Sequence, residues 1–187
     1  MRDGFKQLII GYLFVLIKIH IVVDILPDFI GYIFIYNGIK KIATTSAQSY
    51  EKLKILSAII AIFSVPNFFL SDQMIQQSIW WGYYVIALSL LKVILVYFLF
   101  DILRVVARLL PSDEALLSTK RMYTWYMTII LGSLFFQSIL MNFPIFMIQS
   151  VSIFIVILVL IIEISFLVYL RNMQKRFPDN NLFNRYA

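Results

Sequence analysis

The stretch Lys18-Ile-His-Ile-Val-Val-Asp-Ile-Leu-Pro-Asp-Phe-Ile-Gly-Tyr32 decides how this chain is organised. It holds the only histidine, His20, and two aspartates, Asp24 and Asp28, which are four residues apart. Apolar segments flank it on both sides, and Pro27 near its centre is a residue that favours the first turn of a helix. We therefore predict that a first helix ends within this stretch and that a second helix starts there.

The composition is typical of a membrane protein. The 187 residues are 61% hydrophobic, and the mean hydropathy is +0.88, whereas a soluble domain is only about 45–50% apolar. No charged residue occurs between Met122 and Ile162, or between Gln73 and Leu91. Since a helix that crosses a bilayer needs ~20 mostly apolar residues, both runs are long enough to cross. The absence of cysteine excludes disulfides, a thiolate nucleophile and a cysteine metal site.

The pattern of apolar runs and helix ends predicts an all-α fold, a single transmembrane domain built as a six-helix bundle. The predicted helices cover residues 5–23, 27–42, 50–65, 78–110, 113–141 and 148–176, followed by a short polar tail over 177–187. Asn37-Gly38 and the two lysines after it mark the end of the second helix. Pro66 ends or kinks the third helix. The predicted first helix contains a single glycine, Gly11.

The cationic residues predict the orientation in the membrane. With six crossings, fourteen of the sixteen Lys and Arg residues fall on one side. They are Arg2, Lys6, Lys40, Lys41, Lys52, Lys54, Arg104, Arg108, Lys120, Arg121, Arg171, Lys175, Arg176 and Arg185. The opposite side carries Asp24, Asp28 and Asp72 and no Lys or Arg outside the helices. The positive-inside rule then predicts that both termini lie in the cytoplasm, and the expected location is the plasma (inner) membrane. The net charge of +6 follows this topology, so we expect no nucleic-acid partner.

Six titratable residues form a predicted polar pocket: Lys18, His20, Asp24, Asp28, Lys92 and Glu163. If the first helix continues to Asp24, then His20 and Asp24 share one face at a spacing of four. An imidazole with two carboxylates suits a divalent metal or a proton relay. In the alternative interpretation, the aspartates cap the second helix in a hydrated external turn. We predict neither a specific metal site nor a cofactor.

Lys92 and Glu163 lie near the middle of predicted membrane-crossing helices. An unpaired charge at the centre of a bilayer costs ~2.5–3.5 kcal/mol on insertion scales. We therefore predict that these opposite charges meet or line one hydrated cavity that lies deeper than the aspartates. The alternative is a buried structural pair that ties two helices together.

Sequence motifs of membrane enzymes are missing from the chain. There is no HExxH, no GxSxG and no P-loop, so we predict no catalytic residue. The leading hypothesis is a non-enzymatic protein that binds a small solute or ion, or serves as a transport-accessory subunit. The alternative is a structural or interaction protein without a ligand. The expected partners are the lipid bilayer, a small solute or ion, and another membrane protein or a second copy.

The run Asp24-Ile-Leu-Pro-Asp-Phe-Ile-Gly-Tyr32 resembles a motif of small uncharacterised bacterial polytopic membrane proteins, in which an LPDFIGY-type turn follows the first helix. The resemblance covers roughly the first forty residues and implies no activity. The length, the six predicted helices and the cytoplasmic termini are also similar to the substrate-binding subunits of energy-coupling-factor vitamin transporters. That resemblance implies a third hypothesis, a substrate-binding subunit of such a transporter.

Overall fold

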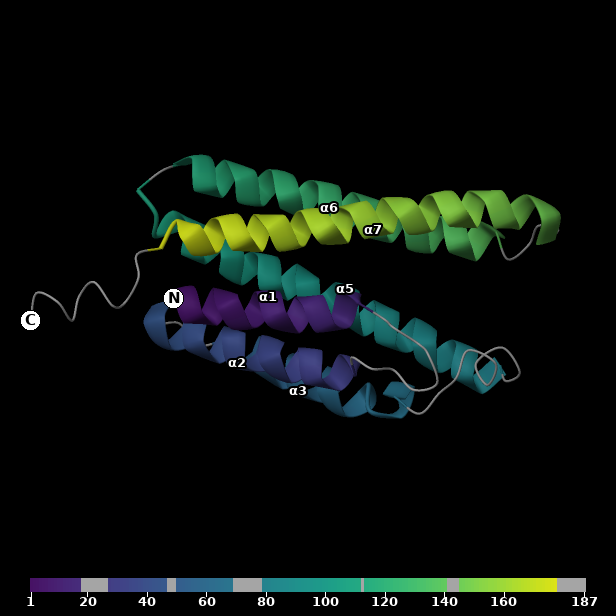
Figure 1. The fold of residues 1–187 in the computed structure, drawn as a ribbon, viewed down its shortest axis with the longest axis horizontal. Coiled ribbons are helices and arrows are strands. Elements are labelled where there is room, and N and C mark those ends of the chain that lie inside the picture. The colour runs from purple at the N-terminus through teal and green to yellow at the C-terminus, as the bar shows by residue number, and fades with distance from the viewer. Residues whose placement is uncertain (18–26, 47–49, 69–78, 112, 141–144, 178–187) are drawn as a thin grey trace, which may run out of the picture. The chain divides into compact units, whose positions relative to one another are not determined.

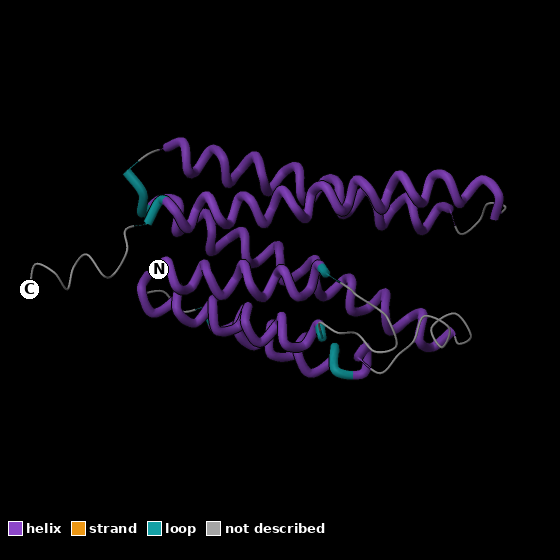
Figure 2. The backbone as a smooth tube through the Cα atoms, viewed as in Figure 1, coloured by secondary structure: helices purple, strands orange, loops and turns teal. Residues whose placement is uncertain are grey.

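The computed structural model describes residues 1–17, 27–46, 50–68, 79–111, 113–140 and 145–177 (Figure 1). Over these residues the chain forms six α-helices and one short 3₁₀ helix and no strand, which confirms the all-α prediction (Figure 2). The elements are α1 (Arg2–Leu16), α2 (Asp28–Ser46), α3 (Glu51–Phe63), η1 (Pro66–Phe68), α5 (Ile79–Arg108), α6 (Asp113–Leu140) and α7 (Ile145–Lys175).

The chain divides into two compact units, and the boundaries between them fall within α5 and α7. The first unit comprises Met1–Ile102 together with Leu170–Ala187. It contains α1, α2, α3, η1, most of α5 and the end of α7. The second unit, Leu103–Tyr169, contains the end of α5, all of α6 and most of α7.

The ends of the first three helices follow from local backbone chemistry. The first helix begins three residues earlier than predicted and ends at Leu16, because the backbone of Ile17 is extended at φ −88° and ψ 94°. It therefore does not continue without interruption to Val23, the predicted end. The second helix begins at Asp28, where a carboxylate in the first turn suits the helix dipole. It continues through Gly38 to Ser46, so the predicted end at residue 42 was wrong; Gly38 instead packs against α1. The third ends shortly before Pro66, which opens η1.

Glycine decides how α1 and α2 pack. Gly4 and Gly11 in α1 face Gly38 and Gly31 in α2, so the two helices lie antiparallel and in contact. A Cβ atom built on Gly11 would lie 2.5 Å from the carbonyl oxygen of Gly31. A Cβ atom built on Gly31 would lie 2.7 Å from the carbonyl oxygen of Gly11. Only glycine permits this approach, and a spacing of seven residues, about two helical turns, keeps each pair on one seam.

The apolar core of the first unit follows the same seam. Fully buried side chains from α1 and α2 include Phe5, Leu8, Tyr12, Ile35, Ile39 and Ile42. They recur at spacings of three, four and seven residues, which is the pattern of one helix face. α3 packs against the other side of α2, and it contributes the buried Leu53 and Ile60.

In the second unit, α6 and α7 are antiparallel neighbours joined by polar contacts. The hydroxyls of Thr119 and Tyr169 are 2.7 Å apart. About two helical turns further along α6, the hydroxyl of Tyr126 donates to the carboxylate of Glu163. At the end of α5, the guanidinium of Arg104 lies 4.2 Å from the ring centroid of Tyr123 on α6, a cation–π contact.

Two of the described helices are long and apolar enough to cross a membrane. They contain the segments Tyr83–Arg108 and Val151–Lys175, and the most apolar 18 residues of each have mean hydropathies of 2.4 and 3.1. The 15 residues of α1 and the 13 residues of α3 span only ~22 and ~20 Å at 1.5 Å per residue. That is less than the ~30 Å hydrocarbon thickness of a bilayer. Charged residues lower the mean hydropathy of the longer α2 and α6.

Candidate functional site

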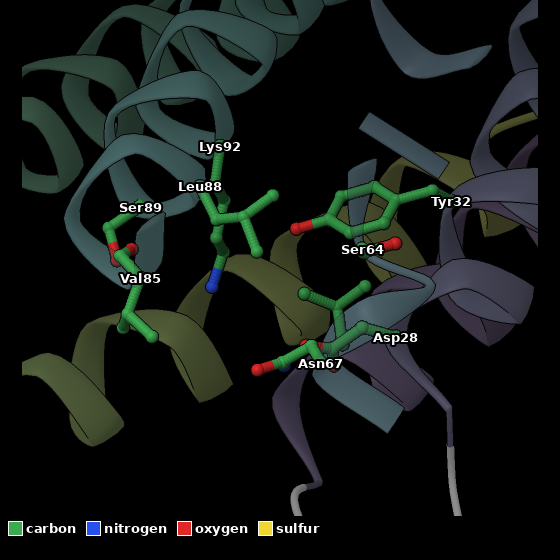
Figure 3. A pocket seen from close by; sticks show the side chains of 9 residues that line it. Asp28, Tyr32, Ser64, Asn67, Val85, Leu88, Ser89 and Lys92 are labelled. Atoms are coloured by element: carbon green, nitrogen blue, oxygen red, sulfur yellow. The ribbon is translucent and has the colours of Figure 1, made fainter. Parts of the chain in front are cut away.

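A polar cavity of about 140 Å³ lies in the first unit, between α1, α2, the segment from α3 to η1, and α5 (Figure 3). Its lining residues are Val15, Asp28, Tyr32, Ser64, Asn67, Val85, Leu88, Ser89 and Lys92. A volume of this size holds roughly five to ten water molecules. The cavity is therefore suited to water, an ion or a very small solute.

One wall of the cavity is acidic and is held by a hydrogen bond between distant parts of the chain. The amide nitrogen Nδ2 of Asn67 donates to Oδ2 of Asp28 over 3.0 Å, and both side chains are 7% exposed. The turn after α3 positions Asn67, because its backbone nitrogen donates to the carbonyl of Ser64. The buried Ser64 hydroxyl in turn donates to the carbonyl of Ala61. A hydrogen bond to a carboxylate is stronger than a neutral one and fixes its orientation.

The opposite wall is basic and comes from α5. The Lys92 side chain extends from this helix toward Asn67 and Tyr32 on the other side of the cavity (Figure 3). Its Nζ atom lies 5.7 Å from the ring centroid of Tyr12, within the range of a cation–π contact. Tyr12 is fully buried in α1, so this contact connects the cation to the glycine-packed pair of helices. Ser89, one turn before Lys92, also lines the cavity.

The structure brings two of the six predicted pocket residues, Asp28 and Lys92, to this cavity. Lys18, His20 and Asp24 lie outside the described residues. His20 and Asp24 were predicted to share a face if the first helix continues to Asp24, but α1 ends at Leu16. The sixth residue, Glu163, belongs to the second unit. Lys92 belongs to the first unit, so the predicted approach of these two residues stays a prediction.

Glu163 is buried in the second unit and bridges two helices. It is 3% exposed, and the hydroxyl of Tyr126 donates to its Oε1 over 3.0 Å. Tyr126 is 1% exposed, and its ring lies 5.2 Å from that of Phe166. A carboxylate in such an apolar setting needs hydrogen bonds to offset the loss of hydration. The contact therefore links α6 to α7 at this level.

Several lining residues were not predicted from the sequence. They include Asn67, Tyr32 and Ser64. A signal for the tyrosines exists, since Tyr12 and Tyr32 directly follow Gly11 and Gly31, and both are buried. The contact between Asn67 and Asp28 spans 39 positions and has no local sequence signature.

The cavity presents charges of both signs together with neutral hydrogen-bonding groups. Asp28 provides a carboxylate and Lys92 an ammonium, while Tyr32 and Ser64 add hydroxyls. Within the described residues no group of three or more His, Cys, Asp or Glu side chains lies close enough to hold a metal ion. Comparisons of the chain with family models, curated proteins and solved structures find no match.

Proposed function

We propose that this chain is a multi-pass membrane protein that crosses the bilayer six times, with both termini in the cytoplasm, and that it binds a small solute or ion in the cavity of the first unit. It acts without catalysing a reaction, as a solute-binding or transport-accessory subunit. The observation that carries this proposal is the pair of opposite charges, Asp28 and Lys92, on facing walls of one small cavity among apolar helices.

Exposed apolar side chains support a location in lipid. From residue 151 onward, helix α7 exposes ten large ones: Val151, Ile153, Phe154, Val156, Ile157, Leu158, Leu160, Ile161, Ile164 and Val168. A soluble monomer rarely exposes a contiguous apolar surface of this kind. In a bilayer the same surface is solvated by acyl chains, so it carries no penalty.

The ends of the described chain support an even number of crossings. In the first unit, the ring of Phe5 stacks on that of Phe177, with centroids 5.7 Å apart. The side-chain amide of Gln174 donates to the backbone carbonyl of Arg2 over 3.4 Å. The start of α1 therefore lies against the end of α7. A chain that begins and ends on the same side of a bilayer agrees with the one-sided distribution of Lys and Arg.

The energetics of buried charge support a binding role. Ionisable groups within membrane-crossing segments are costly, at ~2.5–3.5 kcal/mol each on insertion scales, and they usually mark a substrate or ion pathway. Here the charges of Asp28 and Lys92 share a cavity large enough to hold several waters, whereas a purely structural ion pair would gain most from being packed without a cavity.

The test is a ligand screen against a variant whose cavity is filled. The protein is reconstituted in lipid nanodiscs, and its melting temperature is recorded with sodium, magnesium, chloride and phosphate salts, amino acids, short carboxylates and short amines. Leu88 lines the cavity, and Leu90 lies on the same helix with 49% of its side chain exposed. We expect at least one compound to raise the melting temperature of the wild type and of Leu90→Trp, but not that of Leu88→Trp. A wild type that responds to none of these compounds would refute the proposed function.

A further inference from the structure

We propose that the ligand of this cavity is a small zwitterion, of the class of α-amino acids with a very short side chain. Its carboxylate would pair with the ammonium of Lys92 and its own ammonium with the carboxylate of Asp28. This inference rests on the proposed function, and it adds the chemical class of the solute.

The first argument is the arrangement of charge. Asp28 and Lys92 lie on different walls of the cavity, and both are directed into it (Figure 3). A simple cation attracted by Asp28 is repelled by Lys92, and a simple anion attracted by Lys92 is repelled by Asp28. Coulomb energies at similar distances are similar in size, so these terms largely cancel for a single charge. A ligand with both charges gains attraction at both walls.

The second argument is the distribution of neutral polar groups. The hydroxyls of Tyr32 and Ser64 lie on the same wall as Asp28 (Figure 3). Since Ser64 donates its own hydrogen to the carbonyl of Ala61, its oxygen can act only as an acceptor at the cavity wall. An alkylammonium group carries three N–H donors and no acceptor. One carboxylate and two hydroxyl oxygens provide three acceptors for those donors.

The opposite wall suits a carboxylate. Lys92 supplies an ammonium with three N–H donors, and its cation–π contact with Tyr12 holds that ammonium at the cavity. Asn67 orients Asp28 through a hydrogen bond of 3.0 Å. Both charged groups are therefore positioned by buried neighbours, as a preorganised binding site requires.

The third argument is size. The volume of about 140 Å³ corresponds to a ligand of roughly five to ten non-hydrogen atoms, if each occupies about the space of one water molecule. Glycine and alanine fall within this range, and tryptophan is far too large. Val15, Val85 and Leu88 complete the lining with methyl groups, and these would contact a short aliphatic side chain.

The experiment is a calorimetric titration of the protein in nanodiscs with matched analogues. Alanine carries both charges, ethylamine only the ammonium, and propionate only the carboxylate, while tryptophan controls for size and sodium chloride for ions. We expect saturable binding of glycine or alanine, at least about tenfold weaker binding of either single-charge analogue, and no binding of tryptophan.

Two cavity variants assign the charges. Removing one charged partner by Lys92→Met or Asp28→Asn weakens alanine binding about ten- to hundredfold. Lys92→Met also abolishes the preference for alanine over ethylamine, because the ligand carboxylate no longer finds a cation. By the same reasoning, Asp28→Asn abolishes the preference for alanine over propionate. The exposed-site controls Lys40→Met and Asp3→Asn leave binding unchanged.

Each alternative outcome decides between the two proposals. Wild-type protein that binds sodium, ethylamine or propionate as tightly as alanine overturns the zwitterion inference and leaves the proposed solute or ion site standing. Wild-type protein that binds none of the compounds in either screen overturns both. If a cavity variant fails to fold, the analogue series on the wild type still gives the answer.

Discussion

Replacing Gly11 by alanine is the sharpest test of how this fold is held together. An alanine Cβ at this position would lie 2.5 Å from the carbonyl oxygen of Gly31 and 2.8 Å from the backbone nitrogen of Ile35. Both are backbone atoms of α2, so neither can rotate away as a side chain could. Accommodating the methyl group therefore requires α1 and α2 to move apart along the whole seam.

The expected magnitude combines two opposing terms. Overpacking a tight interface costs about 1–3 kcal/mol, and exchanging glycine for alanine within a helix returns about 0.5–1 kcal/mol. For Gly11 the contacts are with rigid backbone, so we expect a net loss of about 1–2 kcal/mol. At Gly4 the nearest atom is a side-chain carbon of Ile42 at 2.7 Å, and the nearest backbone atom is 3.1 Å away. That side chain can shift, so Gly4→Ala is expected to cost less.

Gly132 provides the matched control. A Cβ atom at this position in α6 would meet nothing within 4 Å, so Gly132→Ala is expected to gain about 0.5–1 kcal/mol from helix propensity alone. The assay is reversible unfolding in mixed micelles with increasing mole fraction of sodium dodecyl sulfate, followed by far-ultraviolet circular dichroism. From most to least stable, we expect Gly132→Ala, wild type, Gly4→Ala and Gly11→Ala. A Gly11→Ala protein as stable as the wild type would show that the helices do not approach through glycine.

Three further outcomes are expected. Tyr126→Phe removes the hydroxyl that donates to Glu163 and costs about 1.5–3 kcal/mol in the same unfolding assay, whereas Glu163→Gln keeps an acceptor and costs less; equal losses for the two variants would contradict this. Asn67→Ala removes the donor to the buried carboxylate of the cavity and lowers stability by about 1–3 kcal/mol, and an unchanged midpoint would argue against the contact. Because the chain has no cysteine, single cysteines report topology directly: an impermeant maleimide applied to whole cells should label Asp72→Cys and not Thr45→Cys, and the reverse pattern would invert the proposed orientation.

The helical elements could be predicted because apolar runs bounded by charges and prolines are a local property. The start of α2 at Asp28 and the break before Pro66 follow from dipole and proline chemistry that any short window contains. The end of α1 could not be read in this way. The backbone turns extended at Ile17, in an apolar stretch without glycine or proline.

The sequence prediction misses the glycine seam because it starts the first helix three residues too late. Gly4 then lies outside the predicted helix, so its spacing of seven from Gly11 is not a pattern within one helix. The matching pair in α2, Gly31 and Gly38, becomes meaningful only when the antiparallel register is known. A spacing of seven in two consecutive segments was present in the sequence and would have predicted the contact.

Only part of the candidate site could be predicted from the sequence. Asp28 and Lys92 attract attention because charges are rare in apolar segments. Their common cavity depends on tertiary packing, and so does the contribution of Asn67, which reaches Asp28 across 39 positions. The same limit applies to Tyr126, whose hydroxyl contacts Glu163 37 positions away. Long-range pairs of this kind leave no periodic pattern.

The facing glycines of α1 and α2 also determine what kind of force joins these helices. At Gly11 and Gly31, each Cα comes close to the carbonyl oxygen of the other, which is the geometry of weak Cα–H···O hydrogen bonds. Such bonds and the accompanying dispersion contacts do not depend on expelling water, so they would also act in the proposed bilayer location, where there is no water to expel. We therefore expect the pairing of these two helices to be nearly indifferent to cooling.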